Sequence, residues 1–133
     1  MEINSTDLLF VYGTLLLPDN NYAKFLRNNA VFLAAGKFPG ELFELGSYPG
    51  AVYVPHATEF VSGGVFRMSN SSLVLQELDN YEGLNHAGCE YARSILPIET
   101  TNGLLNCWTY VYCLSSQGKI KIAGGDYLKY LEK

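Results

Sequence analysis

The chain is poor in positive charge. It contains 9 lysines and arginines against 13 aspartates and glutamates, which gives a net charge of −4, and the basic residues form no cluster. Nucleic-acid binding requires a positive stripe that displaces counterions from phosphates. The sequence therefore excludes nucleic acid as the natural partner.

Long hydrophobic runs are also missing. No segment reaches the roughly 18 continuous apolar residues that span a bilayer. The N-terminus does not combine a basic segment with a long apolar one, as a secretory signal does. We therefore expect a soluble, cytoplasmic protein with no membrane partner.

Cysteine and histidine are scarce. Cys89, Cys107 and Cys113 are an odd set without Cys-x-x-Cys spacing, which is typical of reduced thiols and argues against a disulfide framework or a zinc site. Cys107 and Cys113 lie in an apolar stretch and are predicted to be small core residues. His56 stands alone, so no metal site is expected. His86 is close to Cys89 in sequence, which leaves a cysteine-dependent amidase as an alternative function.

The residues that are abundant indicate a single folded domain over residues 1–133. Hydrophobic residues make up 48% of the chain and charged residues 17%, a balance typical of globular proteins. The 10 tyrosines and 7 phenylalanines are unusually many. Tyrosine has an apolar body and a polar tip, so these residues suit either a pocket for a polar small molecule or the faces of a sheet.

Hydrophobic patterning predicts many short strands and few helices. Gly63-Gly64 lie inside one strand and indicate a bulge or a close backbone approach. Asn102-Gly103 predict a hairpin, since both positions can take positive φ. The fold class that we predict is α+β: a small mixed curled sheet or β-barrel with a few flanking short helices. Strands are predicted at 8–12, 31–33, 40–43, 51–54, 61–68, 91–98 and 104–114, and helices at 20–29, 70–82 and 126–131.

Glu82 is the first candidate for chemistry. It ends a predicted helix beside Leu78, Tyr81 and Leu84, and apolar surroundings raise the pKa of a carboxyl group toward the range that proton transfer needs. A solvated glutamate at a helix end is the alternative. Asp79 is three residues earlier on a similar helix face and is either a second carboxylate of the site or a surface residue.

The loop after the first strand is the second candidate. A chain that leaves a buried strand at Gly13 exposes successive N–H groups, an arrangement suited to a carboxylate or a developing oxyanion. Thr14 adds a hydroxyl group, and an ordinary tight turn is the alternative. Arg93 is either an ion-pair partner at the barrel rim or a substrate anchor.

Six segments share the order of a known family. They are FVYGTL (10–15), GSYPG (46–50), VSGGVF (61–66), LDNYEG (78–83), YAR (91–93) and WTYVY (108–112), and they span nearly the whole chain. With them the chain resembles the γ-glutamylcyclotransferase-like superfamily, most closely its branch of small single-domain γ-glutamylamine cyclotransferases. The resemblance implies a small mixed β-barrel with flanking helices.

The resemblance also implies a reaction on a small γ-glutamyl compound. The α-amine of the γ-glutamyl group attacks its own γ-carbonyl, which releases 5-oxoproline and a free amine or amino acid. By position, Glu82 would be the general base and then the general acid. Backbone groups of Tyr12, Gly13, Thr14 and Leu15 would hold the γ-glutamyl part, and no cofactor or metal is implied.

One segment departs from the family pattern. Relatives often place a basic residue soon after the Tyr-Gly-Thr-Leu loop, whereas Leu16, Leu17 and Pro18 follow it here. This predicts a more apolar rim. It also leaves open a second function, a non-catalytic module that binds a small acidic, γ-glutamyl-like metabolite.

Overall fold

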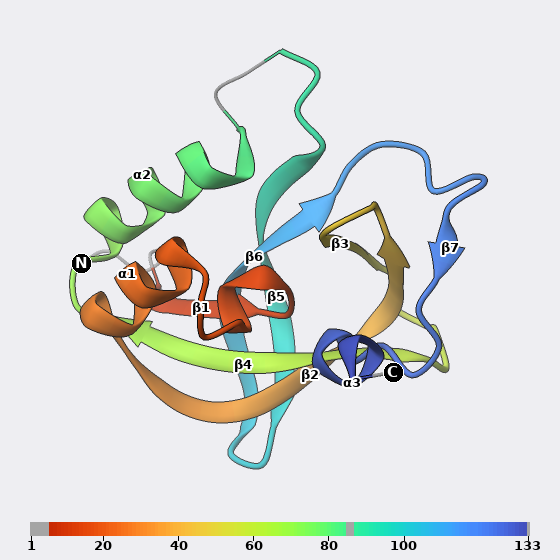
Figure 1. The fold of residues 1–133 in the computed structure, drawn as a ribbon. Helices are drawn as coiled ribbons and strands as arrows, with labels where there is room; N and C mark the ends of the chain where they lie inside the picture. The colour runs from red at the N-terminus through yellow and green to blue at the C-terminus, as the bar shows by residue number, and fades with distance from the viewer. Residues whose placement is uncertain (1–5, 85–86, 133) are drawn as a thin grey trace.

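Short apolar runs form the strands of a curled sheet in the computed structural model, which describes residues 6–84 and 87–132 (Figure 1). Five strands follow one another in the order β2, β4, β1, β6, β5, and a short β2–β5 pairing closes them into a barrel. The β1–β6 pair is parallel and the other pairs are antiparallel, so the predicted mixed barrel is confirmed. The strands are β1 (Leu8–Val11), β2 (Ala30–Glu44), β3 (Pro49–Tyr53), β4 (Phe60–Met68), β5 (Tyr91–Thr100), β6 (Gly103–Tyr112) and β7 (Ile120–Lys121).

Three short helices flank the barrel, and each begins after a side chain that caps it. The helices are α1 (Asn21–Asn29), α2 (Ser71–Glu82) and α3 (Tyr127–Leu131), with a 3₁₀ turn, η1 (Thr14–Leu16). The side chains of Asn20, Asn70 and Asp126 accept hydrogen bonds from backbone N–H groups of the first turn, which satisfies donors that a helix start leaves unpaired. Gly83 ends α2 in the left-handed region, with φ of +81°. Within the described ranges, no helix is long and apolar enough to cross a membrane.

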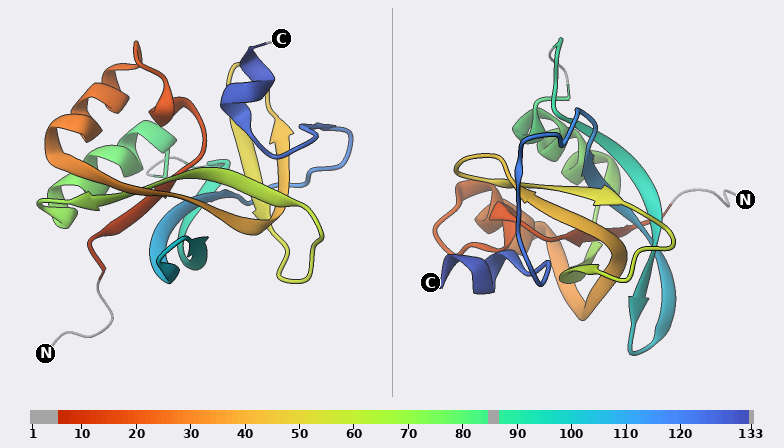
Figure 2. Two further views of the ribbon diagram at one scale, coloured as in Figure 1. Left: turned by 90° about the horizontal axis from the view of Figure 1, so that it is seen from below. Right: turned by 90° about the vertical axis from the view of Figure 1, so that its right-hand side faces the viewer.

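Strand β1 connects the two hydrophobic cores because its side chains alternate between two faces. Phe10 points into the barrel interior, where it meets Phe38 edge to face. Leu9 and Val11 belong to the second core, under α1 and α2, and the two helices lie side by side over the same flank of the barrel (Figures 1 and 2). The end of β1 is therefore held from both sides.

The prediction of two separate strands at 31–33 and 40–43 is wrong. Residues 30–44 form one long strand, β2, whose first part pairs with β4 and whose last part pairs with β3. Pro39 does not interrupt it, because only its carbonyl is needed: it accepts the Val54 N–H at 3.0 Å, and Gly40 donates to Glu59 at 3.0 Å. The irregularity in the pairing of β2 with β4 lies earlier in the strand, as a register shift between Phe32 and Ala34.

The predicted hairpin forms, but with different turn geometry. Thr100 pairs with Gly103 across the turn, and only Gly103 takes positive φ; Asn102 does not. The Thr100 hydroxyl stabilises the turn, since it accepts a hydrogen bond from the Asn102 N–H and donates one to the Gly103 carbonyl. Of the two cysteines predicted to be core residues, Cys107 is buried and Cys113 is exposed.

Candidate active site

A cavity of about 510 Å³ opens where β1 ends. Its size lies within the range that binds small molecules. The five residues to which the family resemblance assigns roles, Glu82 and Tyr12 to Leu15, all line it. The complete lining is Phe10, Val11, Tyr12, Gly13, Thr14, Leu15, Leu17, Asn20, Ser47, Tyr48, Pro49, Tyr81, Glu82, Gly83, Glu90, Tyr91 and Tyr110.

Glu82 supplies one of the two carboxylates of the lining from the last position of α2. Burial raises its pKa from 4.5 to about 7, and the neighbouring charge of Asp79 adds to the increase. The end of a helix presents carbonyls rather than N–H groups, so α2 offers its carboxylate no donor. Among residues 6–84 and 87–132 no side chain or backbone group donates a hydrogen bond to Glu82. The group is therefore available to exchange protons with a ligand near neutral pH.

Tyr81 fixes the end of α2 against the loop that follows β1. Its hydroxyl lies 2.6 Å from Thr14 Oγ1 and accepts from Asn20 Nδ2 at 2.8 Å. The Tyr81 ring stacks on Tyr22, with the ring centroids 4.5 Å apart. These contacts join α2, α1 and the loop, so the position of Glu82 relative to that loop is set by tertiary packing.

The loop of residues 12–15 lines the cavity and contains backbone donors that its own turn leaves without a partner. Its 3₁₀ turn begins with the bond from Leu16 N–H to the Gly13 carbonyl, at 2.9 Å. The N–H groups of Thr14 and Leu15 precede that first bond, so the turn itself gives them no partner. Gly13 packs against Pro49, which also lines the cavity: an added Cβ would lie 2.8 Å from Pro49 Cγ.

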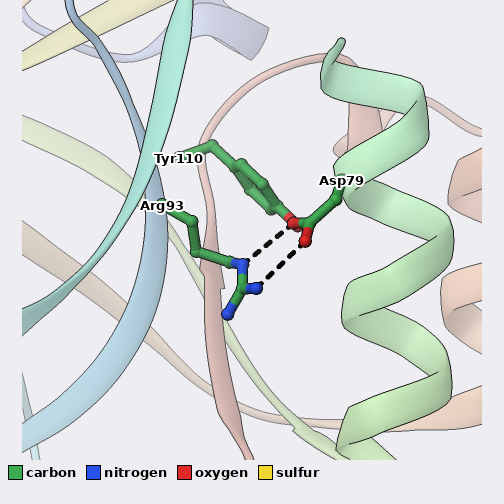
Figure 3. Close-up of polar contacts among 3 residues, drawn as sticks. All are labelled: Asp79, Arg93 and Tyr110. Atoms are coloured by element: carbon green, nitrogen blue, oxygen red, sulfur yellow. Dashed lines mark hydrogen bonds and ion pairs between the residues drawn. The ribbon is translucent and has the colours of Figure 1, made fainter. Parts of the chain in front are cut away.

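The alternatives for Asp79 and Arg93 are decided by one contact. Asp79 accepts two hydrogen bonds from Arg93, at 2.9 and 3.0 Å, and a third from the Tyr110 hydroxyl at 2.7 Å (Figure 3). The guanidinium group also lies over the Trp108 ring, 4.5 Å from its centroid. Arg93 is therefore an ion-pair partner within the barrel wall, and Asp79 is occupied by that pair instead of facing the cavity.

Tyrosines build much of the cavity wall, as the amphipathic character of this residue suggested. The Tyr12 hydroxyl donates to the Tyr110 carbonyl at 2.6 Å and accepts from the Ala51 N–H at 3.2 Å. The Tyr91 hydroxyl donates to the Pro49 carbonyl at 2.5 Å. Burial raises the pKa of Tyr12 and of Tyr91 far above the ordinary value. Both phenols therefore stay protonated and stabilise the cavity wall through their hydrogen bonds to the backbone.

The sequence did not single out Glu90, Tyr48 or Asn20 as site residues. Glu90 and Tyr48 are 42 positions apart, yet the Tyr48 hydroxyl donates to Glu90 Oε1 at 2.6 Å. The only signal was the GSYPG segment, which looks like turn chemistry. Of Leu16, Leu17 and Pro18, from which an apolar rim was predicted, only Leu17 lines the cavity, and the described lining contains no lysine, arginine or histidine.

Cys89 lies outside this cavity. Its thiol donates to the Tyr91 carbonyl at 3.4 Å, and it is not part of the lining. The suggested partner His86 is outside the described residues. Among the described residues, no group of three or more histidines, cysteines, aspartates and glutamates is placed to hold a metal ion.

Comparison with known proteins gives a consistent result. The family model "Gamma-glutamyl cyclotransferase, AIG2-like" matches residues 9–129. The chain is 36% identical over 121 residues to the gamma-glutamylcyclotransferase family protein ytfP of Citrobacter rodentium, covering 90% of this chain and 94% of that one. It is 29% identical over 106 residues to the gamma-L-glutamyl-butirosin B gamma-glutamyl cyclotransferase of Niallia circulans, covering 78% and 65%. The solution structure of ytfP from Escherichia coli superposes with a TM-score of 0.65 at 35% identity, covering 95% of this chain and 99% of that chain.

Proposed function

This chain belongs to the gamma-glutamyl cyclotransferase, AIG2-like family, and we propose that it is a cofactor-independent enzyme that cyclises γ-glutamyl compounds. The substrate is the γ-glutamyl amide of an amine or amino acid. The products are 5-oxoproline and the free amine. The curated butirosin enzyme, whose name states a γ-glutamyl cyclotransferase activity, supports this class of reaction.

The reaction exchanges one amide bond for another. The α-nitrogen of the γ-glutamyl group forms a bond to its own γ-carbonyl carbon, and the bond from that carbon to the leaving nitrogen breaks. Glu82 takes a proton from the α-ammonium group before the attack, and the same nitrogen gives up a second proton as the lactam forms. Glu82 returns protons to the leaving nitrogen, which departs as an ammonium group, so that the protons balance. No electrons are gained or lost, and the nucleophile is already part of the substrate. The protein's main task is therefore to hold a ring-closing pose, which can supply up to roughly 7–11 kcal/mol of the barrier.

The observation that carries this proposal is the environment of Glu82. A carboxyl group with its pKa raised to about 7 is close to evenly poised between base and acid at neutral pH, as a group that both takes and returns a proton requires. Residues 12–15 line the same cavity, and we infer that their N–H groups face it. They are suited to hold a substrate carboxylate or the oxyanion that forms at the γ-carbonyl.

Mass spectrometry of 5-oxoproline tests the proposal directly. The purified protein is incubated with a panel of γ-glutamyl amines and γ-glutamyl amino acids, and product formation is compared with a blank without protein. We expect 5-oxoproline from at least one class. A folded protein that forms no product but gains thermal stability with these compounds would instead support the binding module.

The rate is expected to depend on pH with an unusually high midpoint for a carboxyl base. Because Glu82 must be ionised to accept a proton, kcat/KM should rise with pH through a value near 7, set by the raised pKa of this group. An unperturbed glutamate would give a midpoint near 4.3. Initial rates measured from about pH 4 to pH 8 distinguish the two. A rate that is already constant above pH 5.5 would contradict the role of Glu82.

Asp79→Asn is expected to shift this profile toward acid. The Asp79 charge contributes to the raised pKa of Glu82, and its removal also leaves Arg93 without its counter-charge. Both changes favour ionised Glu82, so the midpoint should move to lower pH. Glu59→Gln, which removes an exposed partner of Lys121, is the matched control and should leave the midpoint in place. An unchanged midpoint in Asp79→Asn would show that the charge of Asp79 does not influence the protonation of Glu82.

A further inference from the structure

The proposed cyclisation leaves one carboxylate of the cavity without a role. Glu90 lines the same cavity as Glu82 and directly precedes β5. Its carbonyl accepts the Cys113 N–H at 2.8 Å, so its backbone is anchored to the chain beyond β6. One acid/base group suffices for the proton transfers of the cyclisation, and Glu82 supplies it.

Tyr48, which lines the same cavity, holds the Glu90 side chain. The bond from the Tyr48 hydroxyl to Glu90 Oε1 is 2.6 Å long, as expected for a charge-assisted bond. This bond is the main reason that the pKa of Tyr48 is raised to about 12, so the phenol remains a donor at neutral pH. Within the described part of the chain, no other group donates to the Glu90 carboxylate, which leaves its second oxygen for a ligand.

The ionisable groups of the lining favour a cation. Its carboxylates are Glu82 and Glu90, and no basic side chain belongs to the described lining. The nearby guanidinium of Arg93 is held by Asp79 in the barrel wall. A second carboxylate on the substrate would therefore meet like charge near Glu90, whereas an ammonium group would meet an ion-pair partner.

We propose that Glu90, held by Tyr48, binds a positive charge on the leaving amine, so that the preferred substrates are γ-glutamyl amides of diamines and polyamines. This inference rests on the proposed cyclisation, in which the α-amine of the γ-glutamyl half faces Glu82. The other half of the substrate then remains for Glu90. Tyr48 and Tyr91 also line the cavity, and tyrosine rings are among the side chains that attract cations.

Two synthetic compounds that differ in one charge test the assignment: γ-glutamylbutylamide and γ-glutamyl-(4-aminobutyl)amide. A hydrogen-bonded ion pair with a partly buried carboxylate corresponds to about a tenfold preference in kcat/KM for the ammonium compound. Glu90→Gln should bring the ratio of the two kcat/KM values close to one. Glu77→Gln removes the same charge from a residue of α2 outside the lining and should keep the wild-type ratio.

Binding measurements keep this test independent of the cyclisation. Isothermal calorimetry on Glu82→Gln compares the affinities of the same two compounds, and we expect the ammonium compound to bind about tenfold more tightly. The double variant with Glu82→Gln and Glu90→Gln should lose this preference. If the wild type forms no product but this preference is present, the cyclisation fails and the cation subsite stands. Equal affinity for both compounds would overturn the subsite. If Glu90→Gln lowered the affinity for both compounds equally, the subsite would also be overturned, because Glu90 would then bind the γ-glutamyl half that the two compounds share.

Discussion

Glu82→Gln is expected to abolish the release of 5-oxoproline while leaving the fold intact. Glutamine has nearly the shape of glutamate, but its amide neither accepts nor returns a proton under these conditions. A positioned acid/base contributes typically about 10²–10⁴-fold to a rate, so kcat should fall by at least about a hundredfold. The measurement is 5-oxoproline by mass spectrometry, with wild type and variant run on the same γ-glutamyl compound.

Glu77→Gln is the matched control for this loss. Glu77 lies on the same helix but is not part of the cavity lining, and its substitution should leave the rate within a factor of about two. Turnover by Glu82→Gln close to that of the wild type would remove Glu82 from the mechanism, whatever the substrate.

The same substitution should also change how stability depends on pH. The pKa of Glu82 is raised on folding from 4.5 to about 7, so the native protein binds more protons than the unfolded chain in this window and loses stability as pH rises through it. Glutamine removes this effect. Above pH 7 the variant should be more stable than the wild type by on the order of 1–3 kcal/mol, and below about pH 4.5 the difference should vanish. Thermal unfolding at both ends of the window provides the check.

Gly63→Ala is expected to disrupt the fold at the strand that leads into the cavity. An added Cβ at Gly63 would lie 2.1 Å from the Val11 carbonyl oxygen and 2.9 Å from the Phe10 ring. Because the nearer atom is backbone, β4 and β1 must move apart. Overpacking costs typically about 1–3 kcal/mol, and a clash with backbone belongs at the upper end of that range, which corresponds to a fall of roughly 10 °C in Tm. Circular dichroism during heating measures this fall.

Gly64→Ala is the neighbouring control on the same strand. Its added Cβ would approach only side-chain rings, with Phe32 Cε1 nearest at 2.9 Å, and Phe32 is 56% exposed, so it can rotate away. The loss of stability should be within about 1 kcal/mol. Equal losses in the two variants would show that the distance between β1 and β4 is not the limiting contact.

The local elements of this protein follow closely from its sequence. Helices were predicted at 70–82 and 126–131, and α2 and α3 begin one residue later, directly after the caps Asn70 and Asp126. These bounds are predictable because capping depends on residues a few positions apart. Strand β2 was predicted wrongly, since Gly36 and Pro39 resemble breakers when their partners in β4 and β5 are unknown. Whether a proline ends a strand depends on which of its backbone groups a neighbouring strand needs, and no local pattern contains that information.

The candidate site divides in the same way. Glu82 and the 12–15 loop were singled out from their segments, and the structure places both in one cavity. For Asp79 and for Arg93 the sequence left two roles open. Their bidentate ion pair connects α2 with β5, a contact that no local pattern contains. Glu90 and Tyr48 were not singled out at all, since their contact joins residues far apart in the chain.

The sequence by itself therefore determined the fold class, the family and the residue types available for proton transfer. Tertiary structure alone decided which of them share a cavity and in what state. The pKa of Glu82 depends on burial and on the charge of Asp79. The Glu90 side chain is held by the hydroxyl of Tyr48, a residue 42 positions earlier in the chain. Both are consequences of desolvation and of distances between segments, which exist only once the chain has closed its barrel.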